Sequence, residues 1–255
     1  MRALSRVLSV FVLVAGPVCF GSAVAQGATP ACTVTGTPGN DSLSGTPGHD
    51  VICGLAGNDV IRGLQGDDLL IGGPGDDQLF GGSGRDELRG DDGFDLLRGD
   101  DGADRSFGGA GGDTFRATQG SAAGVVGDGP DLMVGGADND TVDYSLRTTA
   151  VRVTLDGAAN DGASGEGDRA GVLVNGISDI ENIVSGTGDD VLIGNEQANF
   201  LVSRGGVDRI TGDGGGDTID VFDHAGNDVV TAGPGSDTCV LDAGDARTSC
   251  ETVLP

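Results

Sequence analysis

The stretch Gly36-Thr-Pro-Gly-Asn-Asp41-Ser-Leu43-Ser44 is followed at once by Gly45-Thr-Pro-Gly-His-Asp50-Val-Ile52-Cys53. The same nine-residue pattern continues without insertion to Arg116, so that nine units fill positions 36–116. Glycine occupies positions 1 and 4 of every unit, and aspartate occupies position 6 of every unit. Position 8 is large and apolar in all units but one, where Ser106 replaces it. Such regularity predicts an array of similar stacked coils.

Each position of the unit has a physical role. The glycines permit positive φ and close backbone approach, so the first six residues can turn sharply. The last three residues place one apolar side chain inward between two outward ones, which is a minimal strand of period two. Two units then form one coil of roughly 18 residues, and neighbouring coils pair as parallel strands about 4.8 Å apart. Position 8 is therefore predicted to form a thin stacked core.

The position-6 aspartates are expected to line the two edges of this stack. One edge would carry Asp41, Asp59, Asp77, Asp95 and Asp113, and the other Asp50, Asp68, Asp86 and Asp104. Carboxylates stacked about 5 Å apart repel one another unless a cation lies between them. Ca²⁺ accepts 6–8 oxygen ligands in a flexible shell, whereas Mg²⁺ demands tighter octahedral geometry. The pattern therefore favours calcium.

The repeat lapses and returns further along the chain. It is lost between Ala117 and Val125 and resumes in two units centred on Asp131 and Asp140. After a different segment, it returns with Asp190, and a degenerate unit follows that has Asn199 where aspartate is expected. The remaining units are centred on Asp208, Asp217, Asp228 and Asp237, with two extra residues, Val221 and Phe222, before the last two.

These units resemble the hemolysin-type (RTX) calcium-binding nonapeptide repeat. Gly72-Gly-Pro-Gly-Asp-Asp77-Gln-Leu79-Phe80 and Gly81-Gly-Ser-Gly-Arg-Asp86-Glu-Leu88-Arg89 carry the resemblance most closely. The resemblance implies an all-β fold, a right-handed parallel β-roll, with turn carbonyls and position-6 aspartates as calcium ligands. The metal-ligand residues that it implies are Asp41, Asp50, Asp59, Asp68, Asp77, Asp86, Asp95, Asp104, Asp113, Asp131, Asp140, Asp190, Asp208, Asp217, Asp228 and Asp237.

The pattern predicts six segments. They are a signal peptide (1–25), an N-terminal cap (26–35), a first repeat block (36–143), a spacer with strands (144–184), a second repeat block (185–240) and a C-terminal cap (241–255). The residues Arg2 and Arg6, an apolar run and the small-residue site Ala23-Val-Ala25 are typical of a cleavable secretory signal. No later stretch has membrane-spanning length, so we expect a secreted, extracellular protein with no transmembrane segment in its mature part.

Composition points to a dependence on counter-ions. The chain of 255 residues has 50 glycines, 40 acidic residues and 14 basic residues, all of them arginine, with a formal net charge of −26. Few bulky side chains are present to build a core, and self-repulsion opposes compaction. Nucleic acid and anionic membranes are poor partners for this charge. Calcium ions are the expected partners, with cell-envelope or matrix components as further candidates.

Removal of the signal leaves four cysteines, and an even number in an exported chain favours disulfides. Three pairings are possible. Locality in the sequence favours Cys32–Cys53 and Cys239–Cys250, one at each end of the predicted solenoid. The alternative is free thiols.

The spacer has its own pattern. Ala150-Val-Arg-Val-Thr-Leu155 alternates and predicts a strand, and the residues from Asp156 to Asp168 predict a loop. The loop carries Asp161, Glu166 and Asp168. We expect a solvated acidic loop there, with a further bound ion as the alternative.

Catalytic motifs are missing from the sequence. With only two histidines there is no His-Glu-x-x-His zinc motif, and no Gly-x-Ser-x-Gly nucleophile elbow occurs. We therefore expect a secreted, non-catalytic calcium-binding protein whose roll folds on binding extracellular calcium and has a structural or surface-interaction role. The alternatives are an adhesin, or an enzyme acting on glycans or lipids with a site in the spacer.

Overall fold

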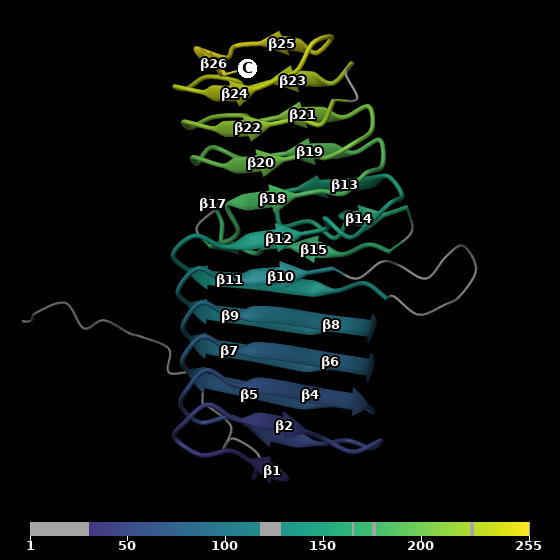
Figure 1. Cartoon of the computed structure of the whole chain (residues 1–255), viewed down its shortest axis with the longest axis vertical. Helices are drawn as coiled ribbons and strands as arrows, with labels where there is room; N and C mark the ends of the chain where they lie inside the picture. Colours follow the sequence, from purple (N-terminus) through teal and green to yellow (C-terminus); the bar gives the residue numbers. More distant parts are fainter. Residues whose placement is uncertain (1–30, 118–128, 165, 175–176, 225–226, 255) are drawn as a thin grey trace, which may run out of the picture. The chain divides into compact units, whose positions relative to one another are not determined.

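The computed structural model describes residues 31–117, 129–164, 166–174, 177–224 and 227–254 (Figure 1). The predicted signal peptide lies outside these residues, as does most of the stretch in which the repeat lapses. All regular secondary structure within the described ranges is β-strand. A helix capable of crossing a membrane is accordingly not found in this part of the chain.

One face of the stack is a single sheet of 11 strands, which we call the long sheet. All of its pairings are parallel. In spatial order its strands are β2 (Ser42–Ser44), β4 (Val60–Gln65), β6 (Gln78–Gly84), β8 (Leu96–Gly102), β10 (Thr114–Arg116), β12 (Thr141–Asp143), β18 (Asn182–Val184), β20 (Phe200–Val202), β22 (Thr218–Asp220), β24 (Thr238–Val240) and β26 (Thr252–Leu254).

The opposite face is divided into two shorter sheets. The N-terminal short sheet contains β1 (Val34–Thr35), β3 (Val51–Cys53), β5 (Leu69–Pro74), β7 (Glu87–Asp92), β9 (Arg105–Ala110), β11 (Leu132–Ala137) and β15 (Arg169–Ala170). The C-terminal short sheet contains β14 (Gly162–Ala163), β13 (Val151–Thr154), β19 (Val191–Ile193), β21 (Arg209–Thr211), β23 (Val229–Thr231) and β25 (Ala246–Thr248). β16 (Leu173–Val174) and β17 (Ile177–Ser178) form a separate antiparallel pair.

The strand register follows the repeat. Ile61 pairs with Leu79, and Leu79 pairs with Leu97, each 18 residues further along the chain. These position-8 side chains are fully or almost fully buried and belong to one hydrophobic cluster. The predicted two-unit coil and its stacked core are thereby confirmed, and the chain is a parallel β-solenoid.

The spacer is built into this stack. β13 lies within the predicted strand 150–155 and pairs with β14 on one side and β19 on the other in the C-terminal short sheet. β15 ends the N-terminal short sheet, while β18 continues the long sheet between β12 and β20. Within the spacer, the N-terminal short sheet therefore ends and the C-terminal short sheet begins. The long sheet continues through the spacer without interruption.

The expectation of a solvated acidic loop is wrong for two of its three residues. Asp161 and Asp168 are only 1% and 2% exposed. Asp161 accepts hydrogen bonds from the backbone N–H groups of Thr154 and Ala170. The loop folds back onto β13, and these contacts take its carboxylates out of water.

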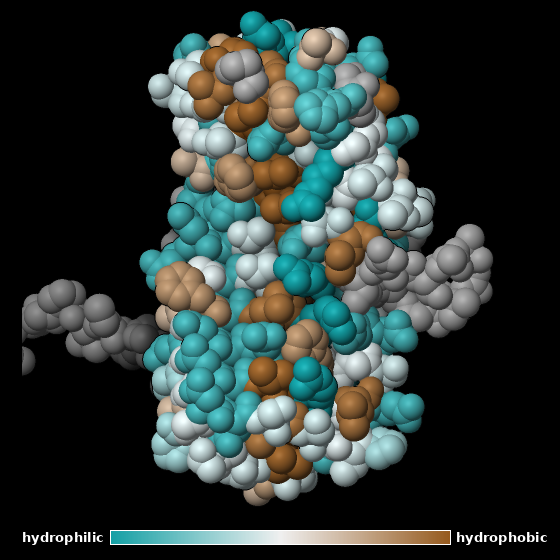
Figure 2. All heavy atoms as spheres, viewed as in Figure 1, coloured by the Kyte–Doolittle hydropathy of each residue, from teal (hydrophilic) through white to brown (hydrophobic). Residues whose placement is uncertain are grey.

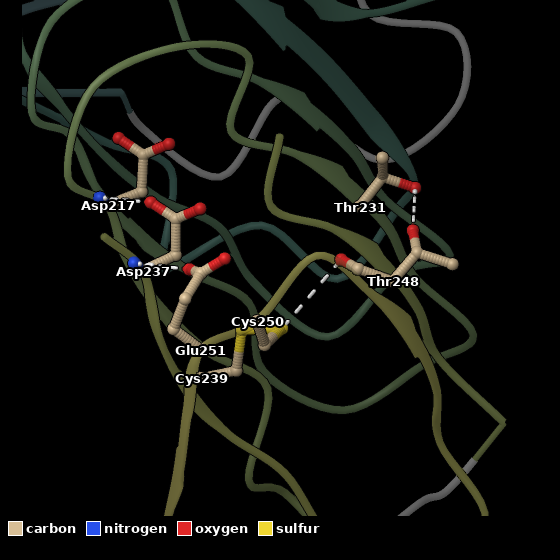
Figure 3. The surroundings of a disulfide bond; sticks show 7 residues. All are labelled: Asp217, Thr231, Asp237, Cys239, Thr248, Cys250 and Glu251. Carbon is tan, nitrogen blue, oxygen red and sulfur yellow. Dashed lines mark hydrogen bonds between the residues drawn. A yellow bond between two sulfur atoms is a disulfide. The ribbon is translucent and has the colours of Figure 1, made fainter. Parts of the chain in front are cut away.

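Both predicted disulfides are present. Cys32 and Cys53 are bonded with their Cα atoms 5.9 Å apart, and Cys239 and Cys250 with theirs 6.0 Å apart. Cys53 lies in β3 and Cys239 in β24. Figure 3 shows the bond between Cys239 and Cys250. Each bond joins a strand of the stack to a segment at one end of the described stack.

The surface reflects the acidic composition. On the face drawn in Figure 2, hydrophilic residues surround several separate apolar clusters. Exposed large apolar side chains occur in turns as well as strands; examples are Leu55, Leu64 and Phe94.

Candidate metal sites

Each position-6 aspartate comes directly before a strand, at the end of the turn that leads into it. Asp59 precedes β4, and Asp77 precedes β6. The glycine at position 1 makes room for this carboxylate, because a Cβ added to Gly72 would overlap Oδ2 of Asp77. The glycine and the aspartate of one unit therefore act together to place a carboxylate inside the turn.

Hydrogen bonds join the aspartates into two continuous ladders. Oδ1 of Asp59 accepts the backbone N–H of Asp41 at 2.8 Å, and Oδ1 of Asp77 accepts that of Asp59 at 2.7 Å. The first ladder runs Asp41, Asp59, Asp77, Asp95, Asp113, Asp140 and Glu181. The second runs Asp50, Asp68, Asp86, Asp104, Asp131 and Asp168. The two predicted edges are confirmed.

Two more ladders continue in the C-terminal half. One runs from the backbone of Val151 through Asp190, Asp208 and Asp228 to Asp245. The other runs Asn199, Asp217, Asp237 and Glu251. Figure 3 shows the last three carboxyl groups stacked one above another beside the disulfide.

Sequence reasoning missed four acidic members of these ladders. They are Asp168, Glu181, Asp245 and Glu251, which lie outside the nine-residue frame. Each comes directly before a strand, namely β15, β18, β25 and β26. An acidic residue immediately before a short strand is a signal that could have found them.

The second oxygen of many of these carboxylates has no hydrogen-bond partner. Among the described residues, a buried Oδ2 atom without a partner occurs in Asp59, Asp68, Asp77, Asp86, Asp95, Asp113, Asp140, Asp217, Asp228 and Asp237. The arginines near the ladders pair instead with other carboxylates, such as Glu87, Asp100 and Asp143. Buried polar atoms are normally satisfied, so a regular series of unsatisfied ones indicates a missing ligand.

Burial makes these carboxylates unfavourable as bare anions. Desolvation raises the pKa of Asp77 to about 6, that of Asp95 to about 7 and that of Asp140 to about 8. Neighbouring carboxylates raise the pKa of Asp140 further, whereas the hydrogen bond from the backbone of Asp113 lowers it. A hard divalent cation held by these oxygens would offset both the desolvation of the carboxylates and their mutual repulsion. The donor set, carboxylates beside glycine-rich turns, fits calcium.

The first two units are different. Oδ2 of Asp41 accepts hydrogen bonds from the backbone N–H and the hydroxyl of Thr37, at 2.6 and 2.9 Å. Thr46 makes the same two contacts with Asp50, and they lower the pKa of that carboxyl. In these first two turns, the threonine at position 2 donates two hydrogen bonds to Oδ2 of the aspartate. This is the oxygen that has no hydrogen-bond partner in many of the other described units.

In the units of residues 36–116, position 2 is strained where it is neither glycine nor threonine. Leu55 and Leu64 both have φ of 86°, and Asp91 and Asp100 have φ of 77° and 71°. These values lie in the left-handed region, which costs a non-glycine residue on the order of 1–3 kcal/mol. The stacked turns therefore impose their backbone shape even where the sequence opposes it.

Asn199 occupies the carboxylate position with an amide. Its Oδ1 accepts the backbone N–H of Asn195 at 2.8 Å, and its Nδ2 donates to the carbonyl oxygen of Glu181 at 2.9 Å. Asn199 is 3% exposed. The amide nitrogen thus satisfies a carbonyl of the previous turn, and this position of the ladder lacks the negative charge that aspartate carries elsewhere.

Replacing Asn199 with aspartate is expected to add one calcium ion to the number bound. The carboxylate would leave the carbonyl of Glu181 without its donor and would place two oxygen ligands at this turn. Equilibrium dialysis of the wild type and Asn199→Asp at saturating calcium gives the two stoichiometries. Asn40→Asp is the matched control: Asn40 is an exposed amide at position 5 whose Oδ1 accepts the backbone N–H of Asn58, so the change should leave the number unchanged. Equal stoichiometry in the wild type and Asn199→Asp would contradict the assignment.

The spacer carboxylates are held by side chains of the protein itself. The hydroxyl of Tyr144, which is fully buried, donates to Oδ2 of Asp168 at 2.9 Å. Arg147 Nη1 lies 2.6 Å from Oε1 of Glu166. These contacts tie Asp168 and Glu166 to the buried side chains of Tyr144 and Arg147.

Comparison with known proteins supports the geometric assignment. A family model of the RTX calcium-binding nonapeptide repeat, comprising four copies of the repeat, matches residues 33–61, 54–88, 80–115, 125–145, 178–219 and 221–246. The matched ranges cover more than half of the chain and include all sixteen of the aspartates proposed as ligands from the sequence. A comparison with curated proteins found no match.

Proposed function

The chain belongs to the RTX calcium-binding nonapeptide repeat family, and on this premise we propose that it binds calcium in its turns and requires calcium to fold. The observation that carries the proposal is the series of buried, unpartnered Oδ2 atoms along the ladders. A ligand that binds only the folded state adds its binding free energy to stability. Calcium bound at these oxygens would therefore stabilise the stacked turns directly.

The proposal also covers where the protein acts and which role it has there. The protein is secreted and meets calcium outside the cell, where modules of this kind bind at about 0.1–1 mM. Two disulfides and a net charge of −26 support this setting. The role is non-catalytic, either structural or in contact with envelope or matrix components. The contacts of Asp168 and Glu166 with Tyr144 and Arg147 support it, because they engage the spacer carboxylates in packing.

Calcium is expected to convert the chelator-stripped chain from coil to β-structure. Without the ion, the stacked carboxylates are both desolvated and mutually repulsive, so the turns should not close. Far-UV circular dichroism during titration with CaCl₂ should show the transition at about 0.1–1 mM. MgCl₂ is the control and should be far less effective, because Mg²⁺ retains its waters. A stripped chain with an unchanged β-spectrum at neutral pH would contradict the proposal.

A further inference from the structure

The connection between β22 and β23 is longer than its counterpart one coil earlier. Six residues, 203–208, join β20 to β21, whereas eight residues, 221–228, join β22 to β23. The two extra residues, Val221 and Phe222, are followed by Asp223 at position 1 of the unit centred on Asp228, where the units of residues 36–116 have glycine. Asp223 therefore adds an acidic side chain at a position that carries none in those units.

The backbone on both sides of Asp223 is anchored. The N–H of Phe222 donates to Oδ1 of Asp220 at 3.0 Å, and the N–H of His224 donates to Oδ2 of Asp242 at 2.6 Å. The rings of Phe222 and His224 also meet edge to face, with centroids 4.7 Å apart. Asp223 is therefore held in place between two fixed neighbours.

Asp223 joins two ladder residues. Asp208, Asp223 and Asp228 each offer a carboxylate oxygen within 4.8 Å of the other two. In the part of the chain that the structure describes, no other group of three acidic, cysteine or histidine side chains has this spacing.

The cluster also contains an unsatisfied buried oxygen. Asp208 and Asp228 are both completely buried. Oδ1 of Asp228 accepts the backbone N–H of Asp208 at 2.8 Å, which leaves Oδ2 buried and, among the described residues, without a partner. This oxygen is an independent sign that a ligand belongs between the three carboxylates.

We propose that Asp223 is a third carboxylate ligand at the Asp208–Asp228 turn and that this turn is the tightest calcium site of the chain. The proposal rests on the calcium-binding function proposed above and extends it to one residue outside the position-6 series. The number of charged ligands and the rigidity of a site set its calcium affinity. Here a third charge is added, and both of its flanking residues are anchored.

Competition between the purified chain and a chromophoric calcium chelator tests the proposal. In the wild type, one ion is expected to bind about tenfold more tightly than the rest, as a third charged ligand should produce. Asp223→Asn should weaken that ion about tenfold, into the range of the others. Asp213→Asn is the matched control: it removes an exposed carboxylate from the preceding turn and should keep the tight ion.

Eu³⁺ emission gives a second readout that does not depend on calcium affinity. At one equivalent of Eu³⁺, lifetimes in H₂O and D₂O count the water molecules on the bound metal. Asp223→Asn should admit water in place of the carboxylate and shorten the lifetime in H₂O, whereas Asp213→Asn should not.

The possible results distinguish the role of Asp223 from the calcium-binding function itself. A tight ion or a lifetime that is unaffected by Asp223→Asn would overturn the role of Asp223, as would a wild type whose ions all bind equally. The calcium-binding function would survive either result. A chain that binds no calcium at any site would overturn both.

Discussion

Replacing Gly84 with alanine is expected to destabilise the calcium-loaded chain by about 3–5 kcal/mol. Gly84 has φ of 143°, a conformation that alanine adopts only with strain. A Cβ at this position would also overlap the carbonyl oxygen of Gly66 in the preceding turn on the same side. Because the overlap is with backbone, no flexible side chain can move away to relieve it. The cost of the overlap therefore adds to the cost of the strained φ.

Gly48→Ala is the matched control because Gly48 occupies the same position 4 of the repeat. Its added Cβ would meet only Oγ1 of Thr46, at 3.8 Å. The expected change is within about 0.5 kcal/mol, as for an ordinary surface substitution. Urea unfolding of both variants and the wild type at saturating calcium provides the comparison. Similar losses in the two variants would show that position 4 is not governed by stacking.

Acidification is expected to restore β-structure to the chain in the absence of calcium. Burial raises the pKa of Asp95 to about 7 and that of Asp140 to about 8, from an ordinary value of 3.8. A carboxyl group whose pKa is higher in the folded state stabilises the fold below its unfolded pKa. That contribution is lost as the pH rises through the folded pKa. The calcium-free fold should therefore strengthen from pH 8 down towards pH 5.

Calcium binding should show the opposite dependence on pH, because the ion requires ionised carboxylates. Circular dichroism of the stripped chain between pH 5 and pH 8, with and without CaCl₂, tests both trends. Asp140→Asn is the control, since its amide cannot ionise, and it should retain calcium-free β-structure to a higher pH than the wild type does. A stripped chain that is equally unfolded at both ends of the range would contradict the prediction.

Much of the fold follows from the sequence because each repeat unit pairs with the unit that lies 18 residues away. Position 8 of each unit meets position 8 of the unit 18 residues away, as Ile61 and Leu79 do. Apolar period, glycine turns and aspartate position therefore predict the strands, the core and the two carboxylate edges without further information. The disulfides were predictable for a related reason, since each closes a short separation of 21 or 11 residues.

Where the repeat is interrupted, the sequence no longer says which turns lie on each other. Asp168 follows Asp131 in its ladder after 37 residues, and Glu181 follows Asp140 after 41. These separations depend on where the spacer re-enters the stack, which is set by its packing around Tyr144 and β13. The same packing buries Asp161, which the sequence alone suggested would be solvated.

The sequence by itself determined the repeating coil, its core and its preference for an oxygen-ligated cation, because all three depend on spacing within 18 residues. The tertiary structure alone decided that the amide of Asn199 reaches the carbonyl of Glu181, and that Asp223 meets Asp208 and Asp228. It also decided which position-4 glycine tolerates a side chain: a Cβ on Gly48 would make only an ordinary contact with Thr46, whereas Gly84 lies against the backbone of the preceding turn. The two glycines differ in this respect because the neighbouring turn in the stack determines how much space each of them has.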